Sequence, residues 1–177
     1  MIQHVIHTYR FNLGFAELLV KDLSPDQMVQ QPNGVVNHPA WSLGHLAMTA
    51  NNLATIFGLD SQVPNGWTDI FVTGGTPSGD VSLYPSKEAL LGALKAQHER
   101  NTQAVQQADP VLFSTPHPDE RVGKHFPTMG DLIVFLMTSH ETDHLGQLAA
   151  WRRAMGLGSA TGRWLVVLLL DLGPCVT

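Results

Sequence analysis

The stretch Thr138-Ser139-His140-Glu141-Thr142-Asp143-His144-Leu145-Gly146-Gln147 lies within the longest helical pattern of the sequence. His140 and His144 are four residues apart, so a helix places both imidazoles on one face. Apolar residues share that face at helical spacing, namely Ile133, Leu136, Met137, Leu148 and Trp151. A buried polar group without a partner costs about 1–3 kcal/mol. The pattern therefore predicts a shared partner for the two histidines, and a metal ion is the simplest candidate.

Helical patterns account for most of the remaining chain. We expect long helices over 2–22, 38–57, 85–108 and from 128 to Gly156 or Gly158, with a short helix after Ser24-Pro25. Two long loops, 59–80 and 109–127, separate them. Trp67 and Phe71 are the residues expected to pin the first loop to the helices, and loops of this length in a compact domain are often functional.

Four long amphipathic patterns without strand alternation predict an all-α four-helix bundle. The length of 177 residues fits a single domain with its own hydrophobic core. We place the bundle at about 2–157. We expect residues 158–177 to form an irregular C-terminal tail, whose apolar run could be a helix, a strand or an oligomer contact.

The composition excludes several classes of protein. The net charge of −5 and the lack of a Lys and Arg run argue against a nucleic-acid partner, which needs a basic face. Cys175 is the single cysteine, so neither a disulfide framework nor a cysteine-based zinc site is expected. The most apolar stretch, 164–170, is much shorter than the ~20 residues that span a bilayer. We therefore expect a cytoplasmic protein without a membrane segment.

A third histidine is expected to face inward from another helix. His45 lies close to the apolar stripe that Trp41 and Met48 form. One such histidine and an i, i+4 pair on a facing helix give a three-imidazole set, His45, His140 and His144, with open positions for water or substrate. Imidazole donors suit Zn²⁺, Ni²⁺, Fe²⁺ or Cu²⁺. The alternative is three separate core histidines, each bonded to a side chain or carbonyl.

Three stretches together resemble the DinB-like superfamily. They are His38-Pro39-Ala40-Trp41-Ser42-Leu43-Gly44-His45-Leu46, His140 through Gln147, and Trp151-Arg152-Arg153-Ala154-Met155-Gly156. The resemblance extends over roughly residues 5–157. It implies an up-down-down-up bundle, commonly dimeric, that binds one zinc or nickel ion through the positions of His45, His140 and His144.

The resemblance also implies a class of reaction. Characterised relatives include thiol S-transferases and thiol-dependent isomerases, so a low-molecular-weight thiol is the expected substrate. An open metal position would lower the pKa of a bound thiol or water. Metal-assisted hydrolysis is the second hypothesis, and a non-catalytic metal- or ligand-binding bundle related to stress is the third.

The string His140-Glu141-Thr142-Asp143-His144 also matches the metalloprotease pattern H-E-x-x-H. Gln147 stands where the extended pattern needs Gly, and neither His nor Glu follows His144, so the protease lacks its third ligand. We therefore place Glu141 on the solvent side of the helix.

The remaining polar residues receive weaker assignments. Side chains that could support or line the site are Asn52, which is the strongest candidate, and Gln147, His7, Tyr9 and Trp41. For His7 a surface or core position is the better hypothesis, and Trp41 is more simply a core residue. His4, His98, His117 and His125 are not expected to take part, and the last three are expected to face solvent.

Overall fold

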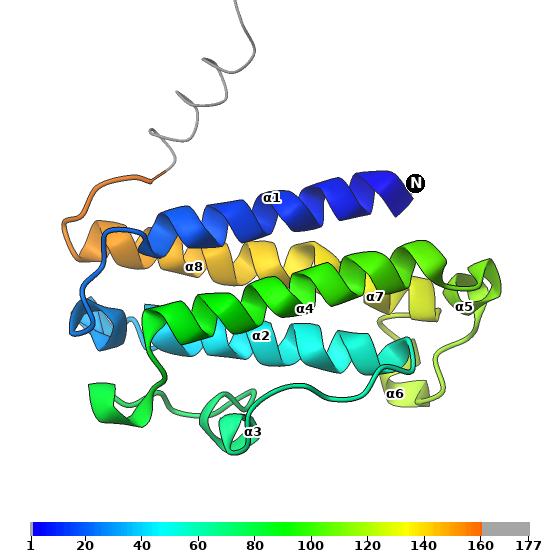
Figure 1. Ribbon diagram of the computed structural model, residues 1–177, viewed down its shortest axis with the longest axis horizontal. Helices are drawn as coiled ribbons and strands as arrows, with labels where there is room; N and C mark the ends of the chain where they lie inside the picture. Colours follow the sequence, from blue (N-terminus) through cyan, green and yellow to red (C-terminus); the bar gives the residue numbers. More distant parts are fainter. Residues whose placement is uncertain (1, 161–177) are drawn as a thin grey trace, which may run out of the picture.

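The computed structural model describes residues 2–160 and is all-helical over that range. Its long helices are α1 (Ile2–Val20), α2 (Pro39–Ile56), α4 (Lys87–Gln107) and the consecutive pair α7 (Met129–Met137) and α8 (Ser139–Ala154). Figure 1 shows α2 and α4 running in one direction and α1 and α7–α8 in the other. The prediction of an all-α, up-down-down-up bundle is confirmed.

The bundle has a definite order of neighbours. Helix α1 packs beside α4 and α8, and α2 packs beside α4, α7 and α8. Helices α4 and α8 therefore occupy opposite corners. Because α2 and α4 are parallel neighbours, the chain must return along the bundle between them, which explains the long connection over residues 57–86.

Short helical segments occupy the connections. They are η1 (Gln27–Val29), η2 (Pro32–Gly34), α3 (Trp67–Ile70), η3 (Val81–Leu83), α5 (Pro110–Ser114) and α6 (Glu120–Gly123). The short helix expected after the first long one corresponds to η1. Both expected long loops thus contain single helical turns, and Trp67 and Phe71 are buried, as predicted for the first.

Capping residues fix where three of the long helices begin. The Nδ1 atom of His38 accepts a hydrogen bond from the backbone N–H of Trp41 at the start of α2. Ser86 caps α4 through the N–H of Ala89. Thr128 and Asp131 form a capping box at the start of α7. The first four backbone N–H groups of a helix have no partner within the helix, and the capping box binds some of them and fixes the direction in which the chain enters α7.

The fourth long helix is not continuous, so the prediction of one helix from 128 to 156 is wrong at its centre. Thr138 has φ −128° and ψ −78°, which lies outside the helical region. Its hydroxyl donates to the carbonyl of Val134 at 2.6 Å, while its backbone N–H turns to Phe135. Threonine competes with the helix ladder in this way. The break lies two residues before His140, and the new helix begins at Ser139.

Two apolar clusters form the core. The larger contains Leu19, Leu43, Phe71 and Trp151, and the smaller contains Ile6, Leu53, Val105 and Ile133.

Hydrogen bonds anchor the last turns of α8 to the C-terminal end of α1 and to the segment that follows it. The indole N–H of Trp151 donates to the carbonyl of Gln30, and Arg152 donates to the carbonyl of Leu19 and to both carboxylate oxygens of Asp22.

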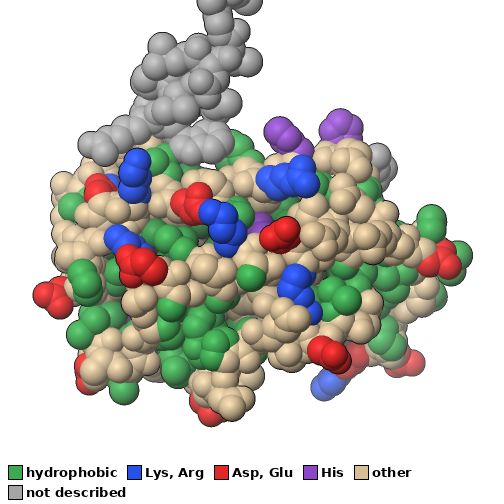
Figure 2. All heavy atoms as spheres, in the orientation of Figure 1, with side chains coloured by type: hydrophobic (Ala, Val, Ile, Leu, Met, Phe, Trp, Pro, Cys, Tyr) green, Lys and Arg blue, Asp and Glu red, His purple; other side chains and the backbone are tan. Residues whose placement is uncertain are grey.

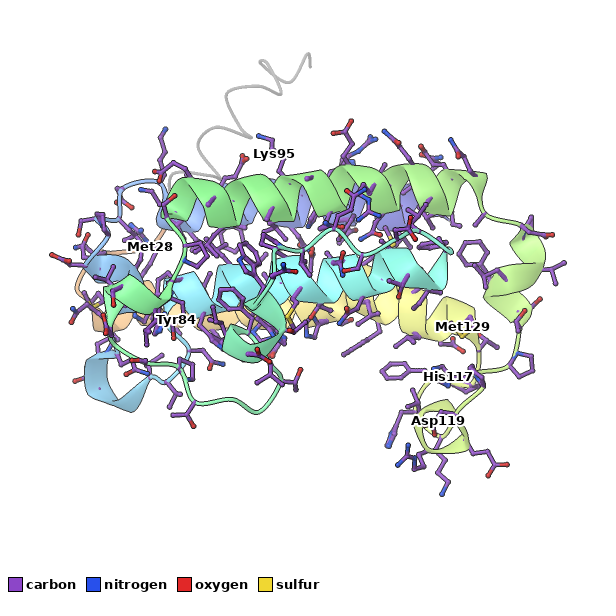
Figure 3. All side chains as sticks on the ribbon, turned by 60° about the horizontal axis from the view of Figure 1, so that its bottom comes forward. Met28, Tyr84, Lys95, His117, Asp119 and Met129 are labelled. Carbon is purple, nitrogen blue, oxygen red and sulfur yellow. The ribbon has the colours of Figure 1, made fainter. Side chains whose placement is uncertain are left out.

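Different segments close the two ends of the bundle. Figure 3 shows Met28 and Tyr84 at the end where α1 finishes, and His117, Asp119 and Met129 at the opposite end. Figure 2 shows Lys and Arg side chains interspersed with Asp and Glu over one face. Among the described residues, no helix is both long and apolar enough to cross a membrane. Most of the expected tail, residues 161–177, lies outside the described range.

Candidate metal centre

The structure brings together the three histidines that the sequence analysis selected. His45 projects from the middle of α2, and His140 and His144 project from the first two turns of α8. The Nε2 atoms of His45 and His140 are 3.4 Å apart, and one nitrogen from each of the three rings lies within 4.8 Å of the others. Two nitrogens bound tetrahedrally to zinc are about 3.3–3.4 Å apart, so the first distance already fits a shared ion.

The orientation of His45 is fixed by two neighbours. Its Nδ1 lies 3.0 Å from the backbone carbonyl of Phe71, and because a carbonyl can only accept, this nitrogen carries the proton. The indole of Trp41 stacks on the imidazole with 4.7 Å between ring centroids. The lone pair of Nε2 is thereby directed toward His140 and His144, as in metal sites whose ligand histidine donates its other N–H to a carbonyl.

A glycine allows Phe71 to reach this position. A Cβ atom on Gly44 would lie 2.2 Å from the ring of Phe71, which no real contact permits. Helix α2 therefore has no side chain at residue 44, and the turn of α3 packs directly on its backbone. The loop expected to be functional supplies the acceptor for His45.

Burial keeps the three rings uncharged. Loss of hydration, followed by the proximity of His45, lowers the pKa of His140 and of His144 to about 4. Burial also lowers the pKa of His45, although its bond to Phe71 acts in the opposite direction. Neutral imidazoles are the form that binds a metal ion. The Nδ1 atoms of His140 and His144 have no hydrogen-bonding partner in the described part of the chain, so packing holds these two rings.

Polar residues border the histidines on the outer side of α8. Gln147 accepts from Asn37 at 3.0 Å and donates to Asp143 at 3.0 Å, and its proximity to His144 partly opposes the fall in that pKa. These groups adjoin a shallow hollow of about 660 Å³. Its lining residues are Thr138, Ser139, Thr142, Asp143, Gly146, Gln147 and Ala150. The lining contains hydroxyls, amides and one carboxylate, and no cation.

The other expected site residues divide into two groups. Trp41 and Gln147 do adjoin the histidines, and Trp41 is at the same time a core residue, as predicted. Asn52 and His7 are exposed, so the structure does not place them in the site. Asn52 fails because the buried amide of α2 is its neighbour Asn51, which binds Ser61 and Gln62 of the following loop. Tyr9 is buried, but its partners are His98 and Asn101.

Two residues assigned to solvent are in fact buried in the core. Glu141 and His98 are each 3% exposed, and Nε2 of His98 lies 2.7 Å from Oε1 of Glu141. Burial raises the pKa of Glu141, while the contact with His98 lowers it. The spacing gave a signal for Glu141, because Met137 and Leu145, four residues to either side, are both buried. His98 likewise follows Leu94 by four residues in α4.

The remaining histidines lie away from the cluster. His4 and His125 are exposed, as expected for His125. His117 is half-buried because its Nδ1 binds the backbone of Asp119, so its expected position in solvent is only partly correct.

Comparison with models of known protein families gave a match over most of the chain. The family model described as the DinB superfamily matches residues 2–148, which include all of α1 to α7 and the part of α8 that contains the histidines. No curated protein and no solved structure matches the chain.

Proposed function

This chain belongs to the DinB superfamily, and from that premise we propose that it binds one divalent transition metal through His45, His140 and His144 and transfers a low-molecular-weight thiol to an electrophile. The proposal rests on the orientation of His45. Its Nδ1–H donates to the carbonyl of Phe71, and its Nε2 lies 3.4 Å from Nε2 of His140. Zinc and nickel are the first candidates, and iron and copper also suit imidazole ligands. A homodimer in the cytoplasm remains a prediction.

The residues present fit such an ion. Three neutral imidazoles converge from two rigid helices, and three protein ligands leave a position open for a substrate, as in catalytic zinc sites. When bound, the metal would lower the pKa of a thiol and so supply a thiolate at neutral pH. The thiolate sulfur forms a bond to the electrophilic carbon, the leaving group departs with its electron pair, and the thiol proton passes to solvent.

The carboxylates near the histidines favour thiol transfer over hydrolysis. A metal-assisted hydrolase of the H-E-x-x-H type uses the glutamate as its general base. Here the carboxylate of Glu141 is bonded to His98 in the core and turned away from solvent. Asp143 is exposed and is bonded to Gln147. Thiol transfer needs no side chain as a general base, because the bound metal ion would favour ionisation of the thiol. The three histidines are therefore the only protein groups that this reaction requires near the metal.

The hollow on α8 indicates which thiols to test. The hollow borders the histidines without including them, and its carboxylate, Asp143, acts on the pKa of both His140 and His144. A thiol bearing several carboxylates would therefore meet repulsion near the candidate metal centre. We expect turnover with a neutral or cationic thiol such as 2-mercaptoethanol or cysteamine to exceed turnover with mercaptosuccinate, using monobromobimane as electrophile. The control is His45→Ala, which should remove the enzymatic rate above the uncatalysed reaction.

Elemental analysis tests the binding step by itself. Purified protein should contain about one transition-metal ion per chain, and His45→Ala should contain none, because one of only three ligands is lost. Equal metal content in that variant would refute the three-histidine site. An intact metal content without turnover for any thiol would refute the transferase and support a metal-binding bundle.

A further inference from the structure

A buried contact between a carboxyl group and an imidazole crosses the centre of the bundle next to the candidate metal centre. Glu141 of α8 and His98 of α4 meet at 2.7 Å although their helices occupy opposite corners, and the side chain of each is 4% exposed. Each carboxylate–cation pair in the described residues has at least one exposed side chain, so this contact is the more deeply buried one. The pair therefore links two helices that otherwise have little direct contact.

Further contacts extend this link to the other two long helices. The ring of Tyr9 in α1 stacks on His98, with 3.6 Å between ring centroids and 9° between planes. Asn101 donates to the hydroxyl of Tyr9 at 3.1 Å and to the carbonyl of Ala50 in α2 at 2.7 Å. One polar network thus contacts α1, α2, α4 and α8.

Stability alone does not explain the network. Within residues 2–160, Nδ1 of His98 and Oδ1 of Asn101 are buried without a hydrogen-bonding partner. Each unpaired atom is unfavourable, and apolar residues of similar volume commonly replace a buried ion pair without loss of stability. A role in fixing one arrangement of the helices is the remaining physical advantage.

The start of α8 needs such a constraint. The chain leaves helical geometry at Thr138, and no side chain caps the new helix. His140 is in its first turn and must face His45 on α2, while Glu141, the next residue, points to the bundle axis. A contact at Glu141 therefore determines how far the first turn is rotated about the helix axis. Asn12 supports the same turn, since its amide donates to the carbonyl of Thr138 at 3.4 Å.

We propose that Glu141 and His98 are positioning residues, which set the rotation of the first turn of α8 so that His140 is directed at His45. This inference rests on the proposed metal site. Glu141, the glutamate of the H-E-x-x-H string, would thus act from the core. Its contact with His98 would affect the metal centre through the backbone of α8, which carries His140.

A matched pair of substitutions tests the proposal. In His98→Gln the amide nitrogen reaches about as far as Nε2 and keeps the bond to Glu141, whereas in His98→Asn the side chain is one methylene shorter and loses it. We expect zinc affinity, measured by competition with a chromogenic chelator, to be nearly unchanged in His98→Gln. In His98→Asn we expect it to be weaker by about tenfold or more, as for other residues that orient metal ligands.

Cobalt provides a readout of geometry. The visible absorption bands of bound Co²⁺ report the arrangement of the ligands, and they should shift in His98→Asn and in the double variant His98→Leu/Glu141→Leu, while remaining as in the wild type in His98→Gln. Val105→Ala is the control for stability, because it opens a cavity beside α4 seven residues after His98 and keeps the Glu141–His98 contact. It should leave both zinc affinity and the Co²⁺ spectrum unchanged.

The possible failures are distinguishable. If the wild type binds no metal, the proposed function fails and the inference fails with it. If the wild type binds metal, and His98→Asn and the double-leucine variant bind zinc as tightly with the same Co²⁺ spectrum, the inference alone is overturned. If the double variant does not fold, the comparison of His98→Gln with His98→Asn decides, since both keep a polar amide at the position.

Discussion

Replacement of Gly44 by alanine should disturb the fold and the candidate metal centre together. The added Cβ would lie 2.2 Å from two atoms of the Phe71 ring and 2.5 Å from a third. Carbon atoms in good contact are about 3.5–4.0 Å apart, so the ring must move by more than roughly 1 Å. Phe71 is 0% exposed and packs in the larger apolar cluster, so this movement must displace other core side chains.

The net effect follows from three contributions. Overpacking costs about 1–3 kcal/mol, and displacement of the Phe71 carbonyl weakens a hydrogen bond to His45 worth about 1 kcal/mol. Alanine is favoured over glycine inside a helix by about 1 kcal/mol, which offsets part of the loss. We therefore expect the free energy of unfolding to fall by about 1–3 kcal/mol and zinc affinity to fall by about tenfold.

Gly92→Ala is the matched control. Gly92 is an exposed glycine inside α4, and a Cβ there meets nothing within 4 Å. This variant should gain up to about 1 kcal/mol and keep its zinc affinity. Urea denaturation gives the stability of both variants, and chelator competition gives the affinity. Equal changes in stability and affinity for Gly44→Ala and Gly92→Ala would refute the role given to the contact between α2 and Phe71.

Three further changes test other parts of the molecule. Arg152→Met should lower the free energy of unfolding by about 1–3 kcal/mol, because it removes the donors to Leu19 and Asp22. In the same urea titration, substitution of the exposed neighbour, Arg153→Met, should change the free energy of unfolding by less than about 0.5 kcal/mol. Thr128→Ala should cost about 1 kcal/mol through loss of the cap of α7, and an unchanged midpoint would contradict that assignment. Metal-free protein should lose stability as the pH falls from about 6.5 toward 4. His38, His140 and His144 have lowered pKa values in the folded state, so the unfolded chain binds protons at a higher pH than the folded chain does. Denaturation in the presence of EDTA at several pH values measures this, and stability that rises on acidification would oppose it.

The pH dependence has a second consequence for metal binding. Protons and the ion compete for the same nitrogens, so acid should release metal as well as weaken the fold. His38 contributes only to the second effect. Its Nδ1 accepts from the N–H of Trp41 and its Nε2 binds the carbonyl of Ser78, which ties the start of α2 to the loop before α4. Protonation of Nδ1 would remove the acceptor that caps α2.

Much of the fold follows from local chemistry that the sequence displays. Apolar residues at helical spacing, proline at the first turn and capping residues such as Ser86 and Thr128 are sufficient to give three of the long helices and the two ends of the fourth, but not its break at Thr138. The positions of His45, His140 and His144 on inward faces follow from the same periodicity. These features depend on residues within one or two turns of each other, so they can be predicted without knowing which helices are neighbours.

Contacts between helices were decided only by the tertiary structure. Helical periodicity identifies a buried stripe, but it does not say which polar residue in the stripe finds a partner across the bundle. Glu141 and His98 were therefore assigned to solvent, although they meet at the axis. Asn52 is the amide expected near the site, but the buried amide is its neighbour Asn51, since the rotation of α2 is set by its packing against other helices.

The sequence by itself determined the helices and the set of histidines that could share an ion. The tertiary structure decided where His140 points, because the break at Thr138 and the contact of Glu141 with His98 set the rotation of α8. It also decided the tautomer of His45, because the carbonyl of Phe71 reaches that ring only when a loop 26 residues away in sequence packs on Gly44. Both depend on groups far apart in the chain, whose positions no local pattern specifies.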